Sequence, residues 1–585
     1  MKVTDYIIQF LVDNNIEKAF SYIGRNAHLC DSLDKHNNIE NIFTVHEQGA
    51  GFSANAYARI TGKTGVATVT SGPGATNLVT TIADCYFDSV PVLFIIGDVP
   101  SGECKGDRDI RQYGFQETDI VALCKPITKY AIQVDDLSNL RYELEKACFL
   151  TQEGRKGPVV FSLPENLQFR TDFDPKNEKS YFDSKEYEVL IKNAPFTGDI
   201  SSDIAEVVAL MNGAKRPVIL VGGGVRLANA VDELRQLLEE TNIPIVYSLM
   251  GKDAVSDEYP HNIGFIGNFG TRHANLAIAN SDVLLVLGSR LDNLQTGRRV
   301  ETFAREAKII QVDIDKNELG IRVKTDLIIK GDLRSFLRAL NKESFDLNIK
   351  DWQKKTSEYK ATFPVSCDLD GRHRLGNTII ETISEYLEDD DCICVDVGEH
   401  QMLVAQSLNI KDKQRVLFSG GFGAMGFALP AAIGASLATG KRAIVISGDG
   451  GFQMNIQELE IIKRRNLAIK IFIINNESLH MVKLRQDVYL EGNSVGSVSD
   501  YSAPRFNKVA KAYGISSAKV SKPEKISKRI KKALMDDKPA LLDIQIHADS
   551  TTVEPRLDFT RPFEEMRPYL SKQALEEQML IELVE

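Results

Sequence analysis

Residues 445–478 constrain the fold more than any other stretch of the chain. An apolar run rich in β-branched residues ends at Asp449, a helical pattern follows, and a second β-branched run ends at Asn475 and Asn476. This order is typical of a βαβ unit, in which a helix joins two parallel strands. Because the carboxyl ends of parallel strands meet at one edge of a sheet, we expect Asp449 and Asn476 to lie close together there.

The same stretch predicts a metal–phosphate site. Asp449, Asn476 and Ser478 offer the hard oxygen ligands that Mg²⁺ prefers, and Mg²⁺ often shares such ligands with the phosphates of a substrate or cofactor. Glycines surround the carboxylate, at Gly448, Gly450 and Gly451. Because these positions have no side chain, backbone N–H groups there can approach a phosphate closely.

The whole chain has the length and composition of a large globular enzyme. Its 585 residues correspond to about three to four domains of ordinary size. A net charge of −11 argues against nucleic acid or an anionic membrane as the main partner. No apolar run approaches the ~20 residues that a membrane span needs, and the N-terminus has no secretory signal pattern. The eight cysteines are scattered, without a C-x-x-C pair. We therefore expect a cytoplasmic protein.

Alternating strand and helix patterns predict an α/β fold with three doubly wound parallel-sheet domains. The first is expected at 1–170, the second at 195–345 and the third at 371–555. Polar or charged stretches at 171–194 and 346–370 are predicted linkers, and residues 556–585 form a charged, partly helical tail.

The first domain carries a second candidate site. Glu47 stands where an apolar strand gives way to a helix rich in small residues. The segment from Thr70 to Asn77 follows another strand and contains Gly72-Pro73-Gly74, a sequence that favours a tight turn into a helix N-terminus. Glycine-rich loops of the third domain are candidates for contact with a cofactor, with further candidate residues at Gly398, His400, Gln401, Gly423, Met425 and Met481.

Together these motifs resemble the thiamine-diphosphate enzymes. Gly-Asp-Gly at 448–450 followed by Asn-Asn at 475–476 matches the fingerprint of that superfamily, at its usual separation. Over about residues 1–555 the chain is similar to the acetohydroxyacid (acetolactate) synthase large-subunit family. The resemblance implies thiamine diphosphate and Mg²⁺ as cofactors, and an active site shared between the two chains of a homo-oligomer.

The resemblance also implies roles for single residues. Glu47 is expected to protonate the aminopyrimidine ring and so promote removal of the thiazolium C2 proton. Phe115 and Gln116 are expected beside the substrate, and Met425 is expected to hold the cofactor bent. The remaining thiamine-diphosphate contacts that it implies include Gly24, Pro73 and Asn77.

The second domain resembles the part of these synthases that holds FAD in a structural role. The residues that carry this likeness are Gly222, Arg290, Asp292, Asp313 and Asp332. The alternative is a flavin-free domain, as in several decarboxylases of the superfamily. A flavin- or nicotinamide-dependent oxidoreductase would leave Glu47 and Asp449 without a role.

Three departures from the family pattern bear on the substrate. Arg25 and Asn26 replace small residues, Arg485 stands where the synthases usually carry a tryptophan, and the polar pair Lys252-Asp253 follows Gly251. An arginine in place of an apolar wall suits a carboxylate, a phosphate or a polyhydroxylated acceptor.

We expect decarboxylation of a 2-oxo acid, pyruvate, followed by carbon–carbon bond formation with a second carbonyl. With pyruvate as the acceptor, the product is 2-acetolactate. The alternative acceptor is a larger one such as a keto-sugar, which the three departures and the tail favour. A simple 2-oxo acid decarboxylase ranks third, because the chain has no adjacent His-His pair.

Overall fold

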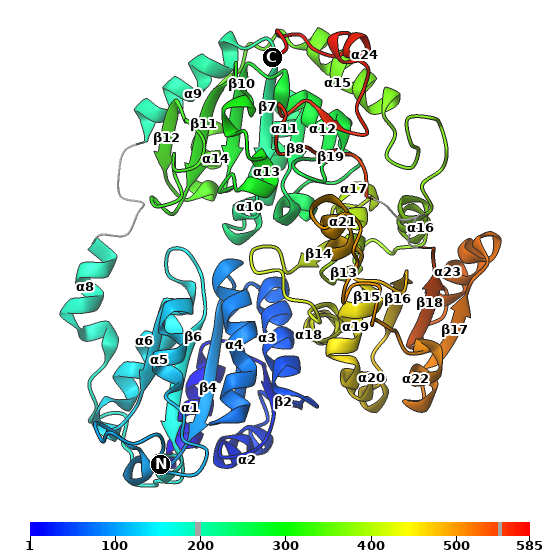
Figure 1. The fold of residues 1–585 in the computed structure, drawn as a ribbon. Helices are drawn as coiled ribbons and strands as arrows, with labels where there is room; N and C mark the ends of the chain where they lie inside the picture. Colours follow the sequence, from blue (N-terminus) through cyan, green and yellow to red (C-terminus); the bar gives the residue numbers. More distant parts are fainter. Residues whose placement is uncertain (193–199, 548–552, 585) are drawn as a thin grey trace.

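The computed structural model describes residues 1–192, 200–547 and 553–584. It contains three sheets of six strands, and every strand pair within these sheets is parallel. Figure 1 shows the three domains side by side, with helices packed around each sheet. The predicted α/β fold with three doubly wound parallel-sheet domains is confirmed.

The N-terminal domain has the strand order β2-β1-β3-β4-β6-β5. In that order the strands are β2 (Glu40–Phe43), β1 (Lys18–Ser21), β3 (Gly65–Thr70), β4 (Val92–Asp98), β6 (Val159–Pro164) and β5 (Tyr130–Gln133). The helices are α1 (Val3–Asp13), α2 (Ala27–Lys35), α3 (Glu47–Thr61), α4 (Pro73–Phe87), α5 (Ile120–Cys124), α6 (Leu140–Gln152), α7 (Glu165–Gln168) and α8 (Lys185–Lys192).

The third domain repeats this topology, with the order β14-β13-β15-β16-β18-β17. Its strands are β14 (Arg415–Phe418), β13 (Cys392–Val395), β15 (Ala443–Gly448), β16 (Ile469–Asn475), β18 (Ala540–Gln545) and β17 (Ser516–Val520). Its helices are α16 (Leu375–Ser384), α17 (Glu399–Ser407), α18 (Ala428–Thr439), α19 (Asp449–Met454), α20 (Leu459–Arg465), α21 (His480–Tyr489), α22 (Phe506–Ala512) and α23 (Ile526–Leu534).

The central domain is wound differently, with the order β12-β11-β10-β7-β8-β9. Renumbered from its own first strand this order is 3-2-1-4-5-6 read from the β9 end, the order typical of dinucleotide-binding sheets. Its strands are β12 (Leu327–Lys330), β11 (Lys308–Asp313), β10 (Val283–Leu287), β7 (Pro217–Val221), β8 (Ile245–Tyr247) and β9 (Asn262–Phe265). Its helices are α9 (Ser201–Gly213), α10 (Gly224–Leu227), α11 (Val231–Thr241), α12 (Arg272–Ala279), α13 (Asn293–Thr296), α14 (Leu333–Leu340) and α15 (Lys350–Thr362).

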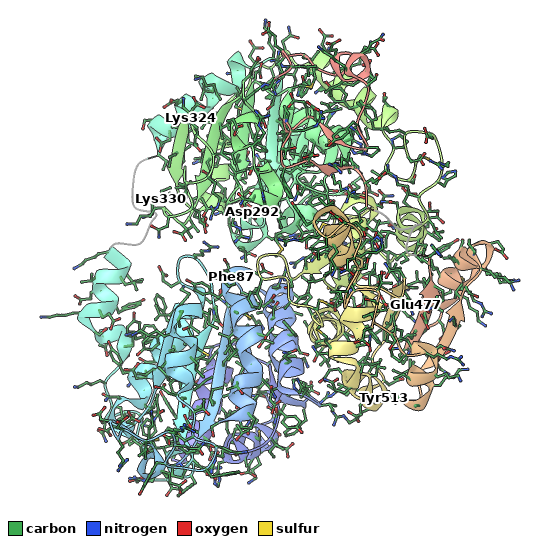
Figure 2. The ribbon with its side chains drawn as sticks, viewed as in Figure 1. Phe87, Asp292, Lys324, Lys330, Glu477 and Tyr513 are labelled. Carbon is green, nitrogen blue, oxygen red and sulfur yellow. The ribbon has the colours of Figure 1, made fainter. Side chains whose placement is uncertain are left out.

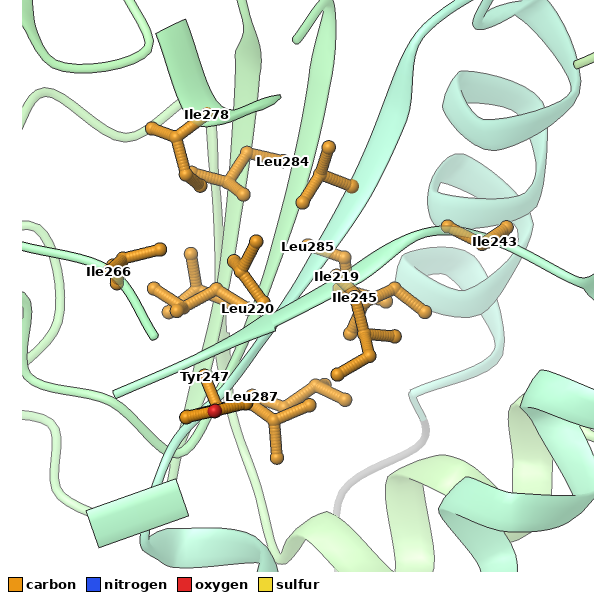
Figure 3. Packing of buried hydrophobic residues seen from close by; sticks show 14 of the residues in the cluster. Ile219, Leu220, Ile243, Ile245, Tyr247, Ile266, Ile278, Leu284, Leu285 and Leu287 are labelled. Atoms are coloured by element: carbon orange, nitrogen blue, oxygen red, sulfur yellow. The ribbon is translucent and has the colours of Figure 1, made fainter. Parts of the chain in front are cut away.

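The central strands of this sheet are apolar along their whole length. Every residue of β7 and β10 is buried, because helices cover both faces of a parallel sheet. Figure 3 shows Ile219 and Leu220 of β7 packed beside Leu284, Leu285 and Leu287 of β10. This core fixes the two strands, and so the loops at their carboxyl ends.

Two stretches that were predicted to be linker or tail pack onto the domains. Within the predicted linker 346–370, α15 buries Trp352 and Tyr359 in the core of the central domain. The tail, which includes β19 (Arg556–Leu557), β20 (Met566–Arg567) and α24 (Lys572–Glu576), lies across the same domain and adds Phe563 and Met566 to that core. The apolar residues of α15 recur at helical spacing, which composition alone does not reveal.

The other predicted linker, 171–194, is also partly packed. Tyr181 is buried against α6, in a group of aromatic rings with Phe149, Phe182 and Tyr187. The end of this linker and the predicted start of the central domain at 195 lie outside the described residues. Among the helices that are described, none has both the length and the apolar character of a membrane span.

Helices α3 and α18 pack the N-terminal domain onto the third domain. Gly434 of α18 lies so close to α3 that a Cβ atom there would be 2.1 Å from the Ser53 carbonyl oxygen. The Ser53 hydroxyl donates a hydrogen bond to the Pro430 carbonyl oxygen at 2.8 Å. The small residues of both helices therefore set how these two domains meet.

Candidate active site

Glu47 is a buried carboxylate at the first position of α3. It is 7% exposed, and the Asn77 amide nitrogen donates a hydrogen bond to its Oε2 at 2.9 Å. His46 caps the helix by accepting a hydrogen bond from the Gln48 backbone N–H. A Cβ atom on Gly74 would lie 3.3 Å from Glu47 Oε1, so the glycine keeps the other carboxylate oxygen accessible. Asn77, predicted to contact the cofactor, lies against Glu47 itself.

The loops after β1 and β3 meet beside Glu47, at the point where the strand order reverses. Gly24 follows β1, and a Cβ atom there would be 2.5 Å from Thr70 Cβ. Pro73 occupies the first turn of α4, where its missing N–H costs nothing. These loops can therefore form one wall of a site whose base is Glu47.

The predicted substrate-side residues fall into two groups. Phe115 is 75% exposed, and Arg25 donates a hydrogen bond to its carbonyl oxygen at 3.1 Å. Arg25 also forms an ion pair with Glu165 at 2.7 Å. Asn26, by contrast, is completely buried: its Oδ1 accepts from the Gly24 N–H at 2.8 Å and its amide nitrogen donates to Thr68. The Asn26 side chain therefore fixes the loop after β1 against β3, and its expected place beside the substrate stays a prediction.

Gln116 has a left-handed backbone conformation, with a φ of 65°. Its carbonyl oxygen lies 2.7 Å from the position that a Cβ atom on Gly72 would occupy. The loop that carries Phe115 and Gln116 thus closes directly over the glycine turn that begins α4.

In the third domain, Asp449 and Asn476 lie at the carboxyl ends of neighbouring strands. Strands β15 and β16 are paired, with Gly448 opposite Ile474. Asp449 is 1% exposed, and its Oδ2 accepts a hydrogen bond from the Tyr501 hydroxyl at 3.0 Å. Burial raises the pKa of Asp449 to about 6, so a nearby cation would be needed to keep it fully ionised at lower pH.

Asn476 is oriented by its neighbours. Its amide nitrogen donates to Glu399 Oε2 at 3.1 Å, and its Oδ1 accepts from the Ser478 N–H and hydroxyl at 3.2 and 3.1 Å. Within the described ranges, no group of three or more His, Cys, Asp or Glu side chains could hold a metal. One carboxylate and one amide oxygen fit Mg²⁺, which usually keeps several waters and takes its remaining ligands from phosphates.

His400 and Gln401 have other partners than a phosphate. His400 Nε2 accepts a hydrogen bond from the Gly448 N–H at 3.3 Å, and burial lowers the pKa of His400 to about 3, which leaves the ring neutral. The Gln401 amide nitrogen donates to the Ser419 carbonyl oxygen at 3.1 Å. Both side chains hold loops of the site in place. The groups that could still bind a ligand here are the backbone N–H groups after Gly398.

Met425 lies against the glycine after the predicted metal ligand. A Cβ atom on Gly450 would be 3.3 Å from Met425 Cε and 2.4 Å from a methyl carbon of Leu479. Gly423 has a φ of 73°, which bends the chain just before Met425. Met481, also predicted to contact the cofactor, is half-buried in the first turn of α21.

Several site residues carry no motif and were missed from the sequence. Asp396 accepts hydrogen bonds from the Gly426 and Ala428 N–H groups at 2.9 and 3.1 Å, and so ties two glycine-rich loops together. Tyr501 reaches Asp449 from an irregular stretch with no sequence signal. Glu399 stands between two predicted residues, Gly398 and His400, and its position there was the only clue.

A cavity with a volume of about 640 Å³ lies at the carboxyl ends of the central domain's strands, and residues of all three domains line it. Predicted residues that line it are Arg290, Asp292, Asp313 and Asp332. Arg290 Nε pairs with Asp292 at 3.0 Å, and burial raises the pKa of Asp313. Figure 2 shows Asp292 facing Phe87 of the N-terminal domain across the boundary between the two domains, and both residues line the cavity.

The strand ends beside this cavity approach each other closely. Gly222 follows β7, and a Cβ atom there would be 2.1 Å from the Gly288 carbonyl oxygen, so the two strand ends come as close as backbones can. Asn268 also lines the cavity, and its Oδ1 is buried with no hydrogen-bond partner among the residues that the structure describes. A buried amide oxygen without a donor is typical of a ligand site.

Lys252 and Asp253, expected to alter substrate choice, are both buried in domain contacts. The Lys252 ammonium bonds to the Tyr247 hydroxyl at 2.9 Å and to Asp257 at 3.0 Å. Asp253 pairs with Arg415 of the third domain at 2.7 Å. Their polarity serves the junction between the central and third domains.

Glu47 and Asp449 have their hydrogen-bond partners in different domains: Asn77 for Glu47 and Tyr501 for Asp449. The start of α3 contacts the segment that follows α19: the Val45 N–H donates to Glu458 at 3.3 Å, and Gln48 accepts from the Asn455 amide at 3.3 Å. Tyr501, Glu399 and Ser478, which bond to Asp449 or Asn476, all belong to the third domain.

Three models of thiamine pyrophosphate enzyme domains match the chain. The N-terminal TPP-binding domain matches residues 1–123, the central domain matches 204–340, and the C-terminal TPP-binding domain matches 396–544. Each model matches a part of one of the three domains described above.

Similar proteins extend over almost the whole chain. The acetolactate synthase large subunit of Lactococcus lactis is 36% identical over 548 residues, which is 92% of this chain and 92% of that protein. The chloroplastic acetolactate synthase of Arabidopsis thaliana is 35% identical, over 93% of this chain and 81% of its own. The large subunit of acetolactate synthase isozyme 2 of Escherichia coli is 33% identical, over 93% and 96%.

Proposed function

The chain belongs to the acetolactate synthase large-subunit family of thiamine pyrophosphate enzymes, and on that premise we propose its acceptor, its further cofactors and its assembly. It is a thiamine-diphosphate-dependent carboligase that decarboxylates a 2-oxo acid, pyruvate, and joins the resulting two-carbon unit to a second carbonyl. We infer that the second carbonyl is another pyruvate, so that the product is 2-acetolactate.

The observation that carries this proposal is the pair of half-sites, a buried carboxyl at Glu47 and the oxygen ligands Asp449 and Asn476. Thiamine diphosphate, when bound, supplies the carbon nucleophile and the electron sink for decarboxylation. Glu47 holds and returns a proton at its carboxyl oxygens, within a site that excludes water. Met425, beside Gly450, fills space next to the metal end of the site.

Mg²⁺ is the metal that we propose for Asp449, Asn476 and the adjacent Ser478. What supports it is the donor set, which consists of one buried carboxylate and neutral oxygens at the ends of neighbouring strands. Such a set is too poor in charge to hold a divalent ion alone, but it is sufficient when a diphosphate supplies the other charges.

FAD is the ligand that we propose for the central cavity. The strand order of the central sheet, the close approach of Gly222 and Gly288, and the unpaired Oδ1 of Asn268 support it. Asp313 and Asp332 follow the ends of neighbouring strands, where ribose hydroxyls could be bound. The flavin would have a structural role, since the carboligation needs no net electron transfer.

A homodimer is the smallest assembly that we propose, with Glu47 of one chain facing Asp449 of its partner. Two sets of exposed apolar side chains support it. Tyr22, Ile23 and Phe115 are 37%, 56% and 75% exposed near Glu47, and Val482, Tyr489 and Val495 are 48%, 58% and 59% exposed after the metal ligands. Apolar surface of this extent is usually covered by a partner. Since the relatives are named large subunits, a smaller partner chain is also part of the proposal.

A larger polar acceptor, such as a keto-sugar, is the second candidate. Arg485 is exposed, lies 5.9 Å from the Tyr489 ring, and has no hydrogen bond or ion pair within 1–192, 200–547 and 553–584. A free guanidinium beside an aromatic ring can bind hydroxyl or phosphate groups. Arg25, by contrast, is already neutralised by Glu165.

The product formed from pyruvate distinguishes the two candidates. The enzyme is incubated with thiamine diphosphate, Mg²⁺ and pyruvate, with and without keto-sugars, and the products are identified by mass. Acetolactate from pyruvate alone is the expected result. An adduct that forms only when a keto-sugar is present would show that the keto-sugar, and not pyruvate, is the acceptor. Free acetaldehyde as the only product would show that the protein is a simple decarboxylase.

A further inference from the structure

Six basic side chains line the central cavity, and five of them are already bonded to protein groups. The five bonded side chains and their partners are Arg59 with the Phe418 carbonyl oxygen, Arg155 with Asp315 and Glu318, Arg226 with Asp253, Arg290 with Asp292, and Arg415 with Asp253. Four of the five bonded arginines join segments that are distant in sequence, and Arg290 pairs within its own loop. The sixth basic side chain, Lys156, differs from them.

Lys156 has no hydrogen bond or ion pair with any residue that the structure describes, and yet it is half-buried. It lies in the connection between α6 and β6, which rises from the N-terminal domain toward the central domain (Figure 1). The neighbouring Arg155 is fixed by Asp315 at 3.1 Å and by Glu318 at 2.9 Å, so the backbone that carries Lys156 is anchored to the far wall of the cavity.

The acidic group whose charge acts on this ammonium, Asp332, forms no ion pair with it among the residues that the structure describes. Asp332 lines the same cavity, but its Oδ1 accepts a hydrogen bond from the Ser335 N–H at 2.9 Å and caps α14. Burial lowers the pKa of Lys156, and the field of Asp332 opposes that shift only in part. A cation that is removed from water without a partner is costly, so such groups are usually bound to an anion.

We propose that Lys156 binds the diphosphate bridge of the dinucleotide that this cavity holds. The inference rests on the proposed function, which places FAD there. The diphosphate is the part of FAD that is anionic at neutral pH, and it is the group that a lysine ammonium at the cavity wall would bind. Lys156 belongs to the N-terminal domain, so the bound dinucleotide links that domain to the central one.

Flavin binding to the full-length protein tests this role without any measurement of activity. Protein freed of flavin is titrated with FAD, and the quenching of flavin fluorescence gives the dissociation constant. For Lys156→Met we expect a dissociation constant about 10- to 100-fold above that of the wild type, because a charge-assisted hydrogen bond is lost. Lys156→Arg should recover most of the affinity.

Lys330→Met is the matched control. Lys330 is exposed at the end of β12, two residues before Asp332, and it does not line the cavity. This substitution removes the same charge near the same carboxylate, and it should leave FAD affinity unchanged. Riboflavin, which lacks the diphosphate, should bind Lys156→Met and the wild type equally, and thermal melting should show that all the variants are folded.

The outcomes separate this inference from the proposed function. If the wild-type protein binds no FAD, the flavin proposal fails. If the wild type binds FAD and Lys156→Met binds it with the same affinity, FAD remains in the cavity but the role of Lys156 is wrong. If Lys156→Met weakens riboflavin and FAD alike, the side chain shapes the cavity and does not contact the diphosphate.

Discussion

At the scale of single residues, Glu47 is the group on which the chemistry depends. It is buried, bonded to Asn77, and kept open on one side by Gly74. The substitution Glu47→Gln retains the shape and removes the proton that the site must exchange. We expect thiamine diphosphate to remain bound, while exchange of its C2 proton slows by about 10²- to 10⁴-fold, as measured by deuterium exchange.

Glu17→Gln is a suitable control for this variant. Glu17 is an exposed carboxylate of the same domain, paired with Lys63 at 2.7 Å. It should exchange the C2 proton at the wild-type rate. Wild-type exchange in Glu47→Gln as well would show that another group activates the cofactor.

A second prediction at this scale concerns Glu458 and the pH dependence of the free energy of unfolding. Its carboxyl group belongs to the third domain and is buried against the start of α3, where it accepts a hydrogen bond from the Val45 N–H. Burial raises the pKa of Glu458 to about 8. Between the ordinary pKa of a glutamate and pH 8, the unfolded chain releases a proton that the folded chain keeps. The free energy of unfolding therefore falls as pH rises through this range and levels off above it.

Glu458→Gln has no such proton to lose. Its melting temperature, relative to that of the wild type, should rise between pH 5 and pH 8.5, because only the wild type is destabilised over that interval. Thermal melts of both proteins at the two pH values measure the difference. A difference that stays constant with pH would mean that Glu458 is ionised in the folded protein.

The candidate site residues that could be predicted from the sequence are those at strand ends whose chemistry requires one residue type. Asp449, Asn476 and Glu47 follow apolar strands and can be found from that position alone. Tyr501 and Glu458 cannot, because their importance comes from tertiary contacts between distant segments. The burial of Asn26 could not be predicted for a similar reason: the sequence shows a polar residue in a loop but not that its amide points inward.

At the scale of elements, the contact between α3 and α18 joins two of the domains. Gly434→Ala would place a methyl group 2.1 Å from the Ser53 carbonyl oxygen, so the helices must separate. Overpacking of this kind costs about 1–3 kcal/mol, and we expect a lower melting temperature by calorimetry.

Gly213→Ala is the control for this substitution. Gly213 ends α9, and a Cβ atom there would meet nothing within 4 Å. Its melting temperature should match or exceed that of the wild type, because alanine restricts the unfolded chain. Equal melting temperatures for both glycine variants would mean that the helix contact can open without cost.

Elements that are buried on both faces were the easiest to predict. Strands such as β7 and β10 are continuous apolar runs, because helices cover both sides of the sheet. The packing of helix α15 and the tail was not predicted, because both sequences are rich in charged residues and only a few apolar residues contact the core of the central domain. The strand order itself is a tertiary property, and the sequence did not distinguish the central sheet from the other two.

At the scale of the whole molecule, Glu47 and Asp449 of one chain lie in two different domains. Glu47 is bonded within the N-terminal domain and Asp449 within the third domain, and the contact between these domains joins Glu458 and Asn455 to the start of α3. In the proposed dimer, a complete site combines Glu47 of one chain with Asp449 of the other. The dimer would also cover the apolar side chains that are exposed in both domains.

Complementation between two inactive variants tests this arrangement most directly. Glu47→Gln and Asp449→Ala, each inactive alone, are produced together with different affinity tags, and acetolactate formation from pyruvate is measured. In a mixed dimer, one site would combine the intact Glu47 of one chain with the intact Asp449 of the other. Random pairing should then restore about a quarter of the wild-type activity per chain. Mixed dimers that are isolated through both tags and remain inactive would contradict a site shared between chains.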